Sequence, residues 1–308
     1  MFPASWLPAG RGRRRVLLTA VSAVALSALL VSLPPVRHAQ GTARSFAEAP
    51  ALTVATWNMC GVERWGCAGT GGEAAKGRAV RRLAGAGAHV LLLQEACADS
   101  VESARKALGS SWRLSFRPYA WRDADGRSRT VRCDGPGRGA AGLAILSSHP
   151  LSAVRVVPSP QPVEGLRRGI LCATVAAHGV RVCNAHLSMP DSDRARPGRE
   201  YRDDQLSALL AAVPERRTVF GGDFNLRPPT AGGTGGRLWP AAPYRIHREC
   251  DQASRTDRSG RPTHESGHKL DYLFTGLRTT DCAVHDTGVS DHRALLIRVD
   301  TRTGAGTG

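Results

Sequence analysis

Lysine is almost absent from this sequence. Among 308 residues it occurs only at positions 76, 106 and 269, so nearly all of the 42 basic residues are arginines. Acidic residues number 26, which leaves a formal net charge of +16. A surplus of arginine is typical of surfaces that bind polyanions, and it is equally typical of a GC-rich coding bias. Charge by itself therefore does not select a function.

The sequence also has few aromatic residues and no internal repeat. Aromatic residues make up 5% of the chain and hydrophobic residues 42%, which suffices for a core and excludes a wholly disordered chain. No interdomain linker is evident in the sequence, and the length of the chain suits one large domain. We predict a domain over residues 52–300, preceded by a linker at 44–51 and followed by a flexible tail at 301–308.

No Cys-x-x-Cys motif is present, which excludes a zinc ribbon and a thioredoxin-type redox site. Eight cysteines are scattered singly, an even set that is typical of disulfide-bonded exported proteins. Cys172 and Cys183 flank the turn of an expected hairpin, and Cys60 and Cys67 would close one short loop. The expected disulfides are Cys60–Cys67, Cys172–Cys183 and, from the four that remain, Cys97–Cys133 and Cys250–Cys282. Reduced, buried cysteines are the alternative.

The N-terminus has the features of an export signal. Four arginines between positions 11 and 15 precede an uncharged run that starts at Val16 and ends at Leu33, where two prolines follow. Residues 1–43 are therefore interpreted as a signal peptide or as an uncleaved N-terminal membrane anchor, since the run is just long enough to span a bilayer. A buried helix is the third interpretation. The first two make the protein secreted or anchored to the outer face of the cytoplasmic membrane.

Short β-branched runs alternate with turns and a few amphipathic helices. The expected strands are 52–57, 90–93, 143–146, 170–175, 180–183, 218–220, 270–274 and 294–299. The expected helices are 74–86, 101–108 and 200–213, and breaker-rich loops are expected at 135–139, 158–163 and 228–236. This order predicts one α/β domain with a mixed sheet at its core.

Polar residues gather where the expected strands end. Such positions are where sheet proteins build their sites. Taken singly, each of these residues is more often a turn former, a cap or a core histidine. Together they supply the acids, amides and imidazoles that metal-assisted phosphodiester hydrolysis requires. The residues are Asn58, Glu95, His186, Asp223, Asn225, Asp271, Asp291 and His292.

These residues belong to seven short motifs in a fixed order. The motifs are Thr-Trp-Asn-Met (56–59), Leu-Gln-Glu (93–95), Gly-Leu-Ala-Ile-Leu-Ser (142–147), Asn-Ala-His-Leu (184–187), Gly-Asp-Phe-Asn (222–225), Leu-Asp-Tyr-Leu-Phe (270–274) and Ser-Asp-His-Arg (290–293). Over about residues 52–300 the chain thereby resembles the endonuclease/exonuclease/phosphatase superfamily, whose founding fold is that of pancreatic deoxyribonuclease. The resemblance implies a four-layered α/β/β/α sandwich, with two mixed β-sheets face to face and helices outside.

The resemblance also implies a metal site. Glu95 would hold a hard divalent cation through its carboxylate, with Asn58 alongside. Asp291 would share this metal or hold a second one. Carboxylate and amide oxygens suit Mg²⁺, with Mn²⁺ or Ca²⁺ as substitutes. We expect Glu95 to lie in a solvent-open cleft.

By the same resemblance, five residues carry the catalytic roles. His292, also expected in the open cleft, would act as general base, held in orientation by Asp271. Asp223 and Asn225 would position the attacking water and contact the phosphate. His186 would donate a proton to a phosphate oxygen or to the leaving group. Whether His292 or Asp223 takes the proton from water is left open by the sequence.

The substrate is the least determined property. An exported, arginine-rich member of this superfamily favours nucleic acid. A phospholipid or sphingolipid is the alternative, especially if residues 16–33 stay in a membrane, and a small inositol or sugar phosphate is a third option. A catalytically inactive nucleic-acid-binding module would not need the whole residue set. No protein partner is indicated, and we expect a monomer.

Overall fold

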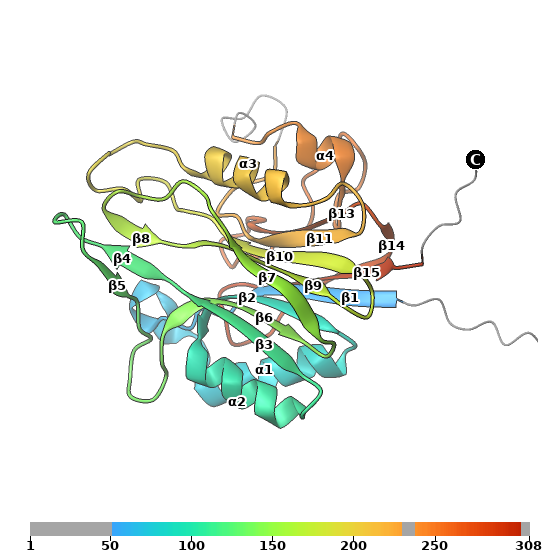
Figure 1. The fold of residues 1–308 in the computed structure, drawn as a ribbon, viewed down its shortest axis with the longest axis horizontal. Helices are drawn as coiled ribbons and strands as arrows, with labels where there is room; N and C mark the ends of the chain where they lie inside the picture. Colours follow the sequence, from blue (N-terminus) through green and yellow to red (C-terminus); the bar gives the residue numbers. More distant parts are fainter. Residues whose placement is uncertain (1–50, 230–237, 303–308) are drawn as a thin grey trace, which may run out of the picture. The chain divides into compact units, whose positions relative to one another are not determined.

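The computed structural model describes residues 51–229 and 238–302, all within one compact unit (Figure 1). The predicted signal or anchor at 1–43 lies outside these residues. Also outside them are most of the linker at 44–51, most of the loop at 228–236 and most of the tail at 301–308. None of the helices in the described ranges is both long enough and apolar enough to cross a membrane.

Two six-stranded mixed sheets form the core. The first has the order β14-β15-β1-β2-β6-β3, built from Arg278–His285, Ala294–Asp300, Ala51–Asn58, Val90–Cys97, Ala141–Ser147 and Arg113–Pro118. The second has the order β12-β13-β11-β10-β9-β7, built from Arg248–Glu249, Asp271–Thr275, Thr218–Asp223, Val180–His186, Gly169–Val175 and Leu151–Val157. Each sheet contains one parallel pair, β1–β2 in the first and β10–β11 in the second.

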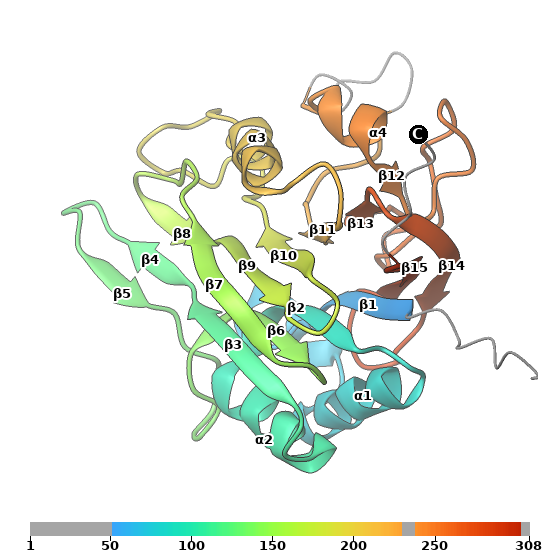
Figure 2. The same ribbon diagram turned by 45° about the vertical axis from the view of Figure 1, so that its right-hand side comes forward.

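A third, small sheet stands beside the two large ones. Its order is β5-β4-β8, from Ser128–Thr130, Ala120–Arg122 and Gly165–Arg167. Figures 1 and 2 show the β4–β5 hairpin projecting beyond the large sheets. Two short 3₁₀ helices, η1 (Glu63–Trp65) and η2 (Cys67–Gly69), follow the end of β1.

Helices cover the outer face of each large sheet (Figures 1 and 2). Helices α1 (Glu73–Gly85) and α2 (Ala98–Leu108) pack on the first sheet, and α3 (Arg202–Ala212) and α4 (Ala242–Ile246) pack on the second. Strand β1 shows why the layers form, because Val54 faces the core between the sheets while Trp57 faces the helices. The predicted four-layered sandwich is confirmed.

All eight predicted strands are present, and the three predicted helices are present with ends shifted by at most three residues. The strands that the sequence did not indicate lie mainly at sheet edges. In β7 and β14 most residues are partly or fully exposed, so neither strand has a strong hydrophobic pattern. Helix α4 has only five residues, too few for a helical periodicity.

All four predicted disulfides are confirmed. Cys172 and Cys183 lie directly opposite each other in the β9–β10 hairpin, as the turn between them predicted. Cys250, which follows β12, is bonded to Cys282 in β14. This bond joins the edge of one large sheet to the edge of the other.

Candidate active site

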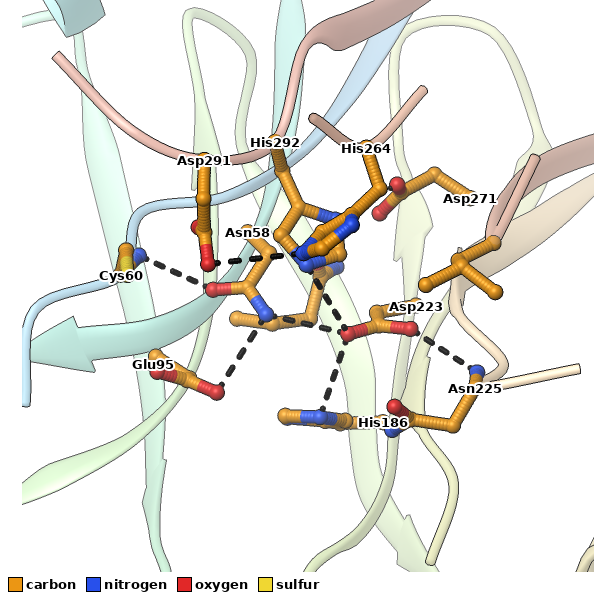
Figure 3. A network of polar contacts seen from close by, with 12 residues as sticks. Asn58, Cys60, Glu95, His186, Asp223, Asn225, His264, Asp271, Asp291 and His292 are labelled. Atoms are coloured by element: carbon orange, nitrogen blue, oxygen red, sulfur yellow. Dashed lines mark hydrogen bonds and ion pairs between the residues drawn. The ribbon is translucent and has the colours of Figure 1, made fainter. Parts of the chain in front are cut away.

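Strand direction brings the predicted site residues to one edge of both sheets. The parallel pairs β1–β2 and β10–β11 end at this edge, and β13 and β15, antiparallel to their neighbours, begin there. Figure 3 shows the side chains from these ends pointing toward one another. They are Asn58, Glu95, His186, Asp223, Asp271 and His292.

A β-bulge sets the direction of Glu95. The pairing of β2 with β6 shifts register between Leu93 and Ala96, and Glu95 has a φ of 49°. A left-handed conformation is costly for a glutamate, so the surrounding structure must impose it. The backbone N–H of Glu95 donates to the hydroxyl of Tyr119 at 3.1 Å, which is one such constraint.

Two glycines allow Asp223 to reach the site. A Cβ on Gly221 would lie 1.8 Å from the carbonyl oxygen of Tyr272, and Gly222 has a φ of 133° that side chains rarely adopt. Strand β11 can therefore pack closely between β10 and β13. Beyond it, the N–H of Asn225 donates to Oδ1 of Asp223 at 2.8 Å, which fixes the carboxylate in a tight turn.

Asp223 is the centre of the constellation. Its Oδ2 accepts a hydrogen bond from Nδ2 of Asn58 at 3.0 Å and lies 3.4 Å from Nε2 of His186 and 3.8 Å from Nε2 of His292. The side chain is only 1% exposed. Burial raises the pKa of Asp223 above its ordinary value, although His292 opposes this effect.

Asp271 lies against the ring of His292. Its Oδ2 lies 2.8 Å from Nδ1 of the imidazole, which leaves Nε2 facing Asp223. Burial alone would lower the pKa of His292, but the carboxylates of Asp271 and Asp223 raise it to about 10. The charges of Asp223 and His292, 3.8 Å apart, therefore oppose the protonation of the one and favour that of the other.

A residue that the sequence did not reveal orients His186. The hydroxyl of Tyr119 lies 2.8 Å from Nδ1 of His186 and already accepts the N–H of Glu95. Because the carboxylate oxygen Oδ2 of Asp223 can only accept and lies 3.4 Å from Nε2, the single proton of the neutral imidazole lies on Nε2, and Nδ1 accepts the hydroxyl proton of Tyr119. Burial lowers the pKa of His186 well below its ordinary value, and the positive charge of Arg168 lowers it further. The ring is therefore neutral.

Glu95 has the surroundings of a cation ligand. It is 7% exposed, and it forms no ion pair with any lysine or arginine in the described part of the chain. Burial raises its pKa to about 7, against the opposing charge of Arg168. A buried carboxylate without a cationic partner, beside the carboxylate of Asp223, fits a hard divalent cation.

Asn58 bridges the two carboxylates. Its Nδ2 donates to Oε1 of Glu95 at 3.3 Å and to Oδ2 of Asp223 at 3.0 Å, while its Oδ1 accepts the N–H of Cys60 at 2.9 Å. The amide therefore turns its oxygen away from Glu95. Metal ligation by Asn58 remains a prediction, and it requires the amide to rotate.

The Cys60–Cys67 disulfide lies among the carboxylates predicted to bind metal. Sγ of Cys67 is 3.8 Å from Oε2 of Glu95, and both sulfurs lie within 4.8 Å of a carboxylate oxygen of Asp291. The carboxylate of Asp291 also has a polar neighbour, because its Oδ2 lies 3.6 Å from Nε2 of His264. The disulfide thus closes one wall of the site between Glu95 and Asp291.

The structure brings all eight predicted residues together, but one expectation about them is wrong. Glu95 and His292 are 7% and 6% exposed, so they do not lie in an open cleft. Packing of both sheets and the Cys60–Cys67 loop around the strand ends buries them. Asn225 is partly exposed and its Nδ2 donates to the carbonyl of Leu187, 3.0 Å away.

Two functional neighbours had no sequence signal. Tyr119 lies between β3 and β4, and its contact with His186 spans 67 positions of sequence. His264 lies in the long segment between β12 and β13, and its ring centroid is 4.6 Å from that of His292. Neither residue follows a motif or ends a predicted strand.

Comparison with known proteins agrees with this geometry. A model described as the Endonuclease/Exonuclease/phosphatase family matches residues 55–292. The chain belongs to the endonuclease/exonuclease/phosphatase family. Family members are hydrolases that act on phosphoester bonds, and they generally use divalent metal ions. This protein is therefore a phosphoester hydrolase of that family.

Solved structures of family members share the fold at low sequence identity. The catalytic domain of human Nocturnin with bound sulfate is 18% identical, with 81% of this chain and 94% of that chain covered and a TM-score of 0.56. A family protein from Leptotrichia buccalis is 16% identical, with 80% and 99% covered and a TM-score of 0.54. A D. rerio TDP2 humanized by 14 mutations is 18% identical, with 80% and 98% covered and a TM-score of 0.53. No curated protein matches the chain.

Proposed function

We propose that this protein is an exported, Mg²⁺-dependent phosphodiesterase that cleaves nucleic acid as a monomer. The convergence of Asn58, His186 and His292 on one carboxylate oxygen of Asp223 carries the catalytic part of the proposal. The arginine surplus supports a polyanionic substrate. The N-terminal sequence pattern and the four disulfides support export.

Glu95 and Asp291 would hold the cation, since their carboxylates flank one wall of the site. When bound, a divalent ion stabilises the charge on the phosphate and acidifies water. Asn58 keeps Glu95 and Asp223 close together through its two donated hydrogen bonds. The cation and the proton-accepting group would therefore lie on either side of one phosphate.

The coupled pair of Asp223 and His292 would accept the proton of the attacking water. Asp271 holds the imidazole so that Nε2 faces Asp223 throughout. His186 would donate its Nε2–H to a phosphate oxygen, an orientation that Tyr119 maintains. Water then forms the new P–O bond, the bond to the leaving oxygen breaks, and that oxygen takes up a proton.

The test uses oxidised protein with supercoiled plasmid, a single-stranded oligonucleotide and sphingomyelin vesicles in parallel, with Mg²⁺ or with EDTA. We expect cleavage of nucleic acid that EDTA abolishes. Asp271→Asn, which keeps the shape of the side chain, should lower the rate about 100-fold or more. The control Arg216→Ala removes an exposed side chain after α3 and should leave the rate unchanged. Cleavage of the vesicles with intact nucleic acid would overturn the proposed substrate.

A further inference from the structure

A cavity of about 600 Å³ lies beside the active site. Its walls come from η1, from the β4–β5 hairpin and from the segment that follows β5. The side chains that define its chemistry are Arg64, Trp65, Trp121, Arg129, Arg132 and Arg194. Its volume is in the range of cavities that hold small ligands.

The cavity and the active site share a wall. The ring of Trp65 lies 6.1 Å from that of Tyr119, and the ring of Tyr119 lies 5.7 Å from that of His186, measured between centroids. Cys133, which lines the cavity, is bonded to Cys97 at the end of the strand that carries Glu95. A ligand in this cavity would therefore lie two ring contacts away from His186.

The cavity offers aromatic faces and unpaired positive charge. The guanidinium of Arg194 lies over the ring of Trp121, 4.8 Å from the ring centroid, so the two side chains form a stacked pair. Arg64 is paired with Asp134, whereas Arg129, Arg132 and Arg194 form no ion pair with any residue that the structure describes. The lining contains no acidic side chain. A cationic lipid headgroup would be repelled here, whereas a planar base with its phosphates would be attracted.

We propose that this cavity binds one unpaired nucleotide of a single-stranded nucleic acid, adjacent to the phosphodiester that is cleaved. The base would stack on the pair that Trp121 and Arg194 form, and Arg129 and Arg132 would contact the flanking phosphates. Bases in a duplex keep both faces stacked and cannot present one to Trp121. This inference rests on the proposed function, because it assigns a substrate class to the same site.

Binding is measured first, without catalysis. Fluorescence anisotropy of a labelled oligothymidylate and of a duplex of equal length is recorded in EDTA for Trp121→Ala, Arg129→Ala and the control Arg216→Ala. We expect Trp121→Ala to weaken binding of the single strand about tenfold and binding of the duplex much less. Arg129→Ala changes an exposed side chain, so its effect does not depend on packing. We expect it to weaken binding and reduce the salt dependence.

Cleavage then separates the two proposals. For the single strand, kcat/KM should fall about tenfold in Trp121→Ala, while kcat/KM for bis(p-nitrophenyl) phosphate, which has no nucleotide that could reach the cavity from the reacting phosphate, should fall much less. Pocket variants that bind and cleave the single strand like Arg216→Ala would overturn the cavity assignment and leave the proposed function intact. Equal losses for duplex and single strand would also overturn it. Wild-type protein that hydrolyses the small diester but neither binds nor cleaves nucleic acid would overturn both.

Discussion

The hydroxyl of Tyr119 lies 2.8 Å from Nδ1 of His186 and accepts the backbone N–H of Glu95. One side chain thus connects the predicted metal-binding strand of one sheet to a histidine of the other sheet that we propose to be catalytic. Because the hydroxyl proton faces Nδ1, Tyr119 would determine which ring nitrogen of His186 donates in the proposed reaction. Tyr119 is a positioning residue.

Tyr119→Phe should lower kcat by about tenfold or more, with little change in KM, because His186 loses the partner that fixes its tautomer. Nitrogen NMR of the His186 ring should show a mixture of the two neutral tautomers in place of one. Tyr244→Phe is the matched control, because the Tyr244 hydroxyl is buried with no hydrogen-bond partner in the described part of the chain. Unchanged NMR signals in Tyr119→Phe would contradict the role.

Glu95→Gln should separate the stability of the metal-free protein from its response to metal. Without metal, the variant should be at least as stable as wild type, because a neutral amide replaces a buried, unpaired carboxylate. A Mg²⁺ concentration of 100 times the Kd should stabilise wild type by about 2.7 kcal/mol and the variant much less. Thermal denaturation with Mg²⁺ and with EDTA measures both effects. Glu102→Gln on α2 serves as control and should respond to Mg²⁺ like wild type. If Mg²⁺ stabilises Glu95→Gln as much as it stabilises wild type, Glu95 is not a ligand.

Asp193 should make stability depend on acid pH. Its carboxylate accepts hydrogen bonds from the N–H groups of Val163, Glu164 and Ala195 and from the hydroxyl of Tyr201, at 2.6–3.1 Å. Burial would raise the pKa of Asp193, but these hydrogen bonds outweigh burial and lower it to about 2. The stabilisation is therefore complete above about pH 4 and lost as the pH falls toward 2.

Urea unfolding at pH 6 and at pH 3 measures this contribution. Asp193→Asn should be less stable than wild type at pH 6 by on the order of 2 kcal/mol, since the amide cannot accept all four hydrogen bonds. The difference between the two proteins should shrink at pH 3. A difference that is the same at both pH values would show that the hydrogen bonds of Asp193 are not linked to its charge.

Removal of the Cys60–Cys67 disulfide should weaken metal binding as well as stability. The double variant Cys60→Ser/Cys67→Ser frees the loop that lies against the two carboxylates predicted to bind metal. Its free energy of unfolding should fall by about 2–3 kcal/mol, and its Kd for Mg²⁺ should rise several-fold. Calorimetric titration with Mg²⁺ measures the second effect.

Cys172→Ser/Cys183→Ser is the control for this experiment. That disulfide also closes a short segment, within the β9–β10 hairpin, and in the described part of the chain neither of its cysteines belongs to a cluster of potential metal ligands. It should reduce stability by a similar amount without a matching loss of Mg²⁺ affinity. Equal losses of affinity in both variants would mean that the Cys60–Cys67 loop has no special relation to the metal.

The parts predicted from sequence and the parts missed differ in their physical origin. Central strands such as β2 and β10 are buried on both faces, so their hydrophobic runs were visible. Site residues such as Asp223 stand at the ends of those runs. The edge strand β7 is largely exposed and had no such pattern. Tyr119 and His264 act through contacts that depend on how distant segments pack, and a single sequence carries no signal for these contacts.

The small β5-β4-β8 sheet supplies Trp121 and Arg129 to the cavity but none of the predicted catalytic or metal-binding residues. Those residues lie at the strand ends of the two large sheets or close beside them. If the cavity binds substrate as proposed, chemistry and substrate choice are encoded in separable pieces of the chain. A lineage could lengthen, shorten or exchange the β4–β5 hairpin without disturbing the geometry of bond cleavage. For protein engineers, the hairpin is a replaceable module, through which one hydrolytic scaffold can be directed to different phosphodiesters.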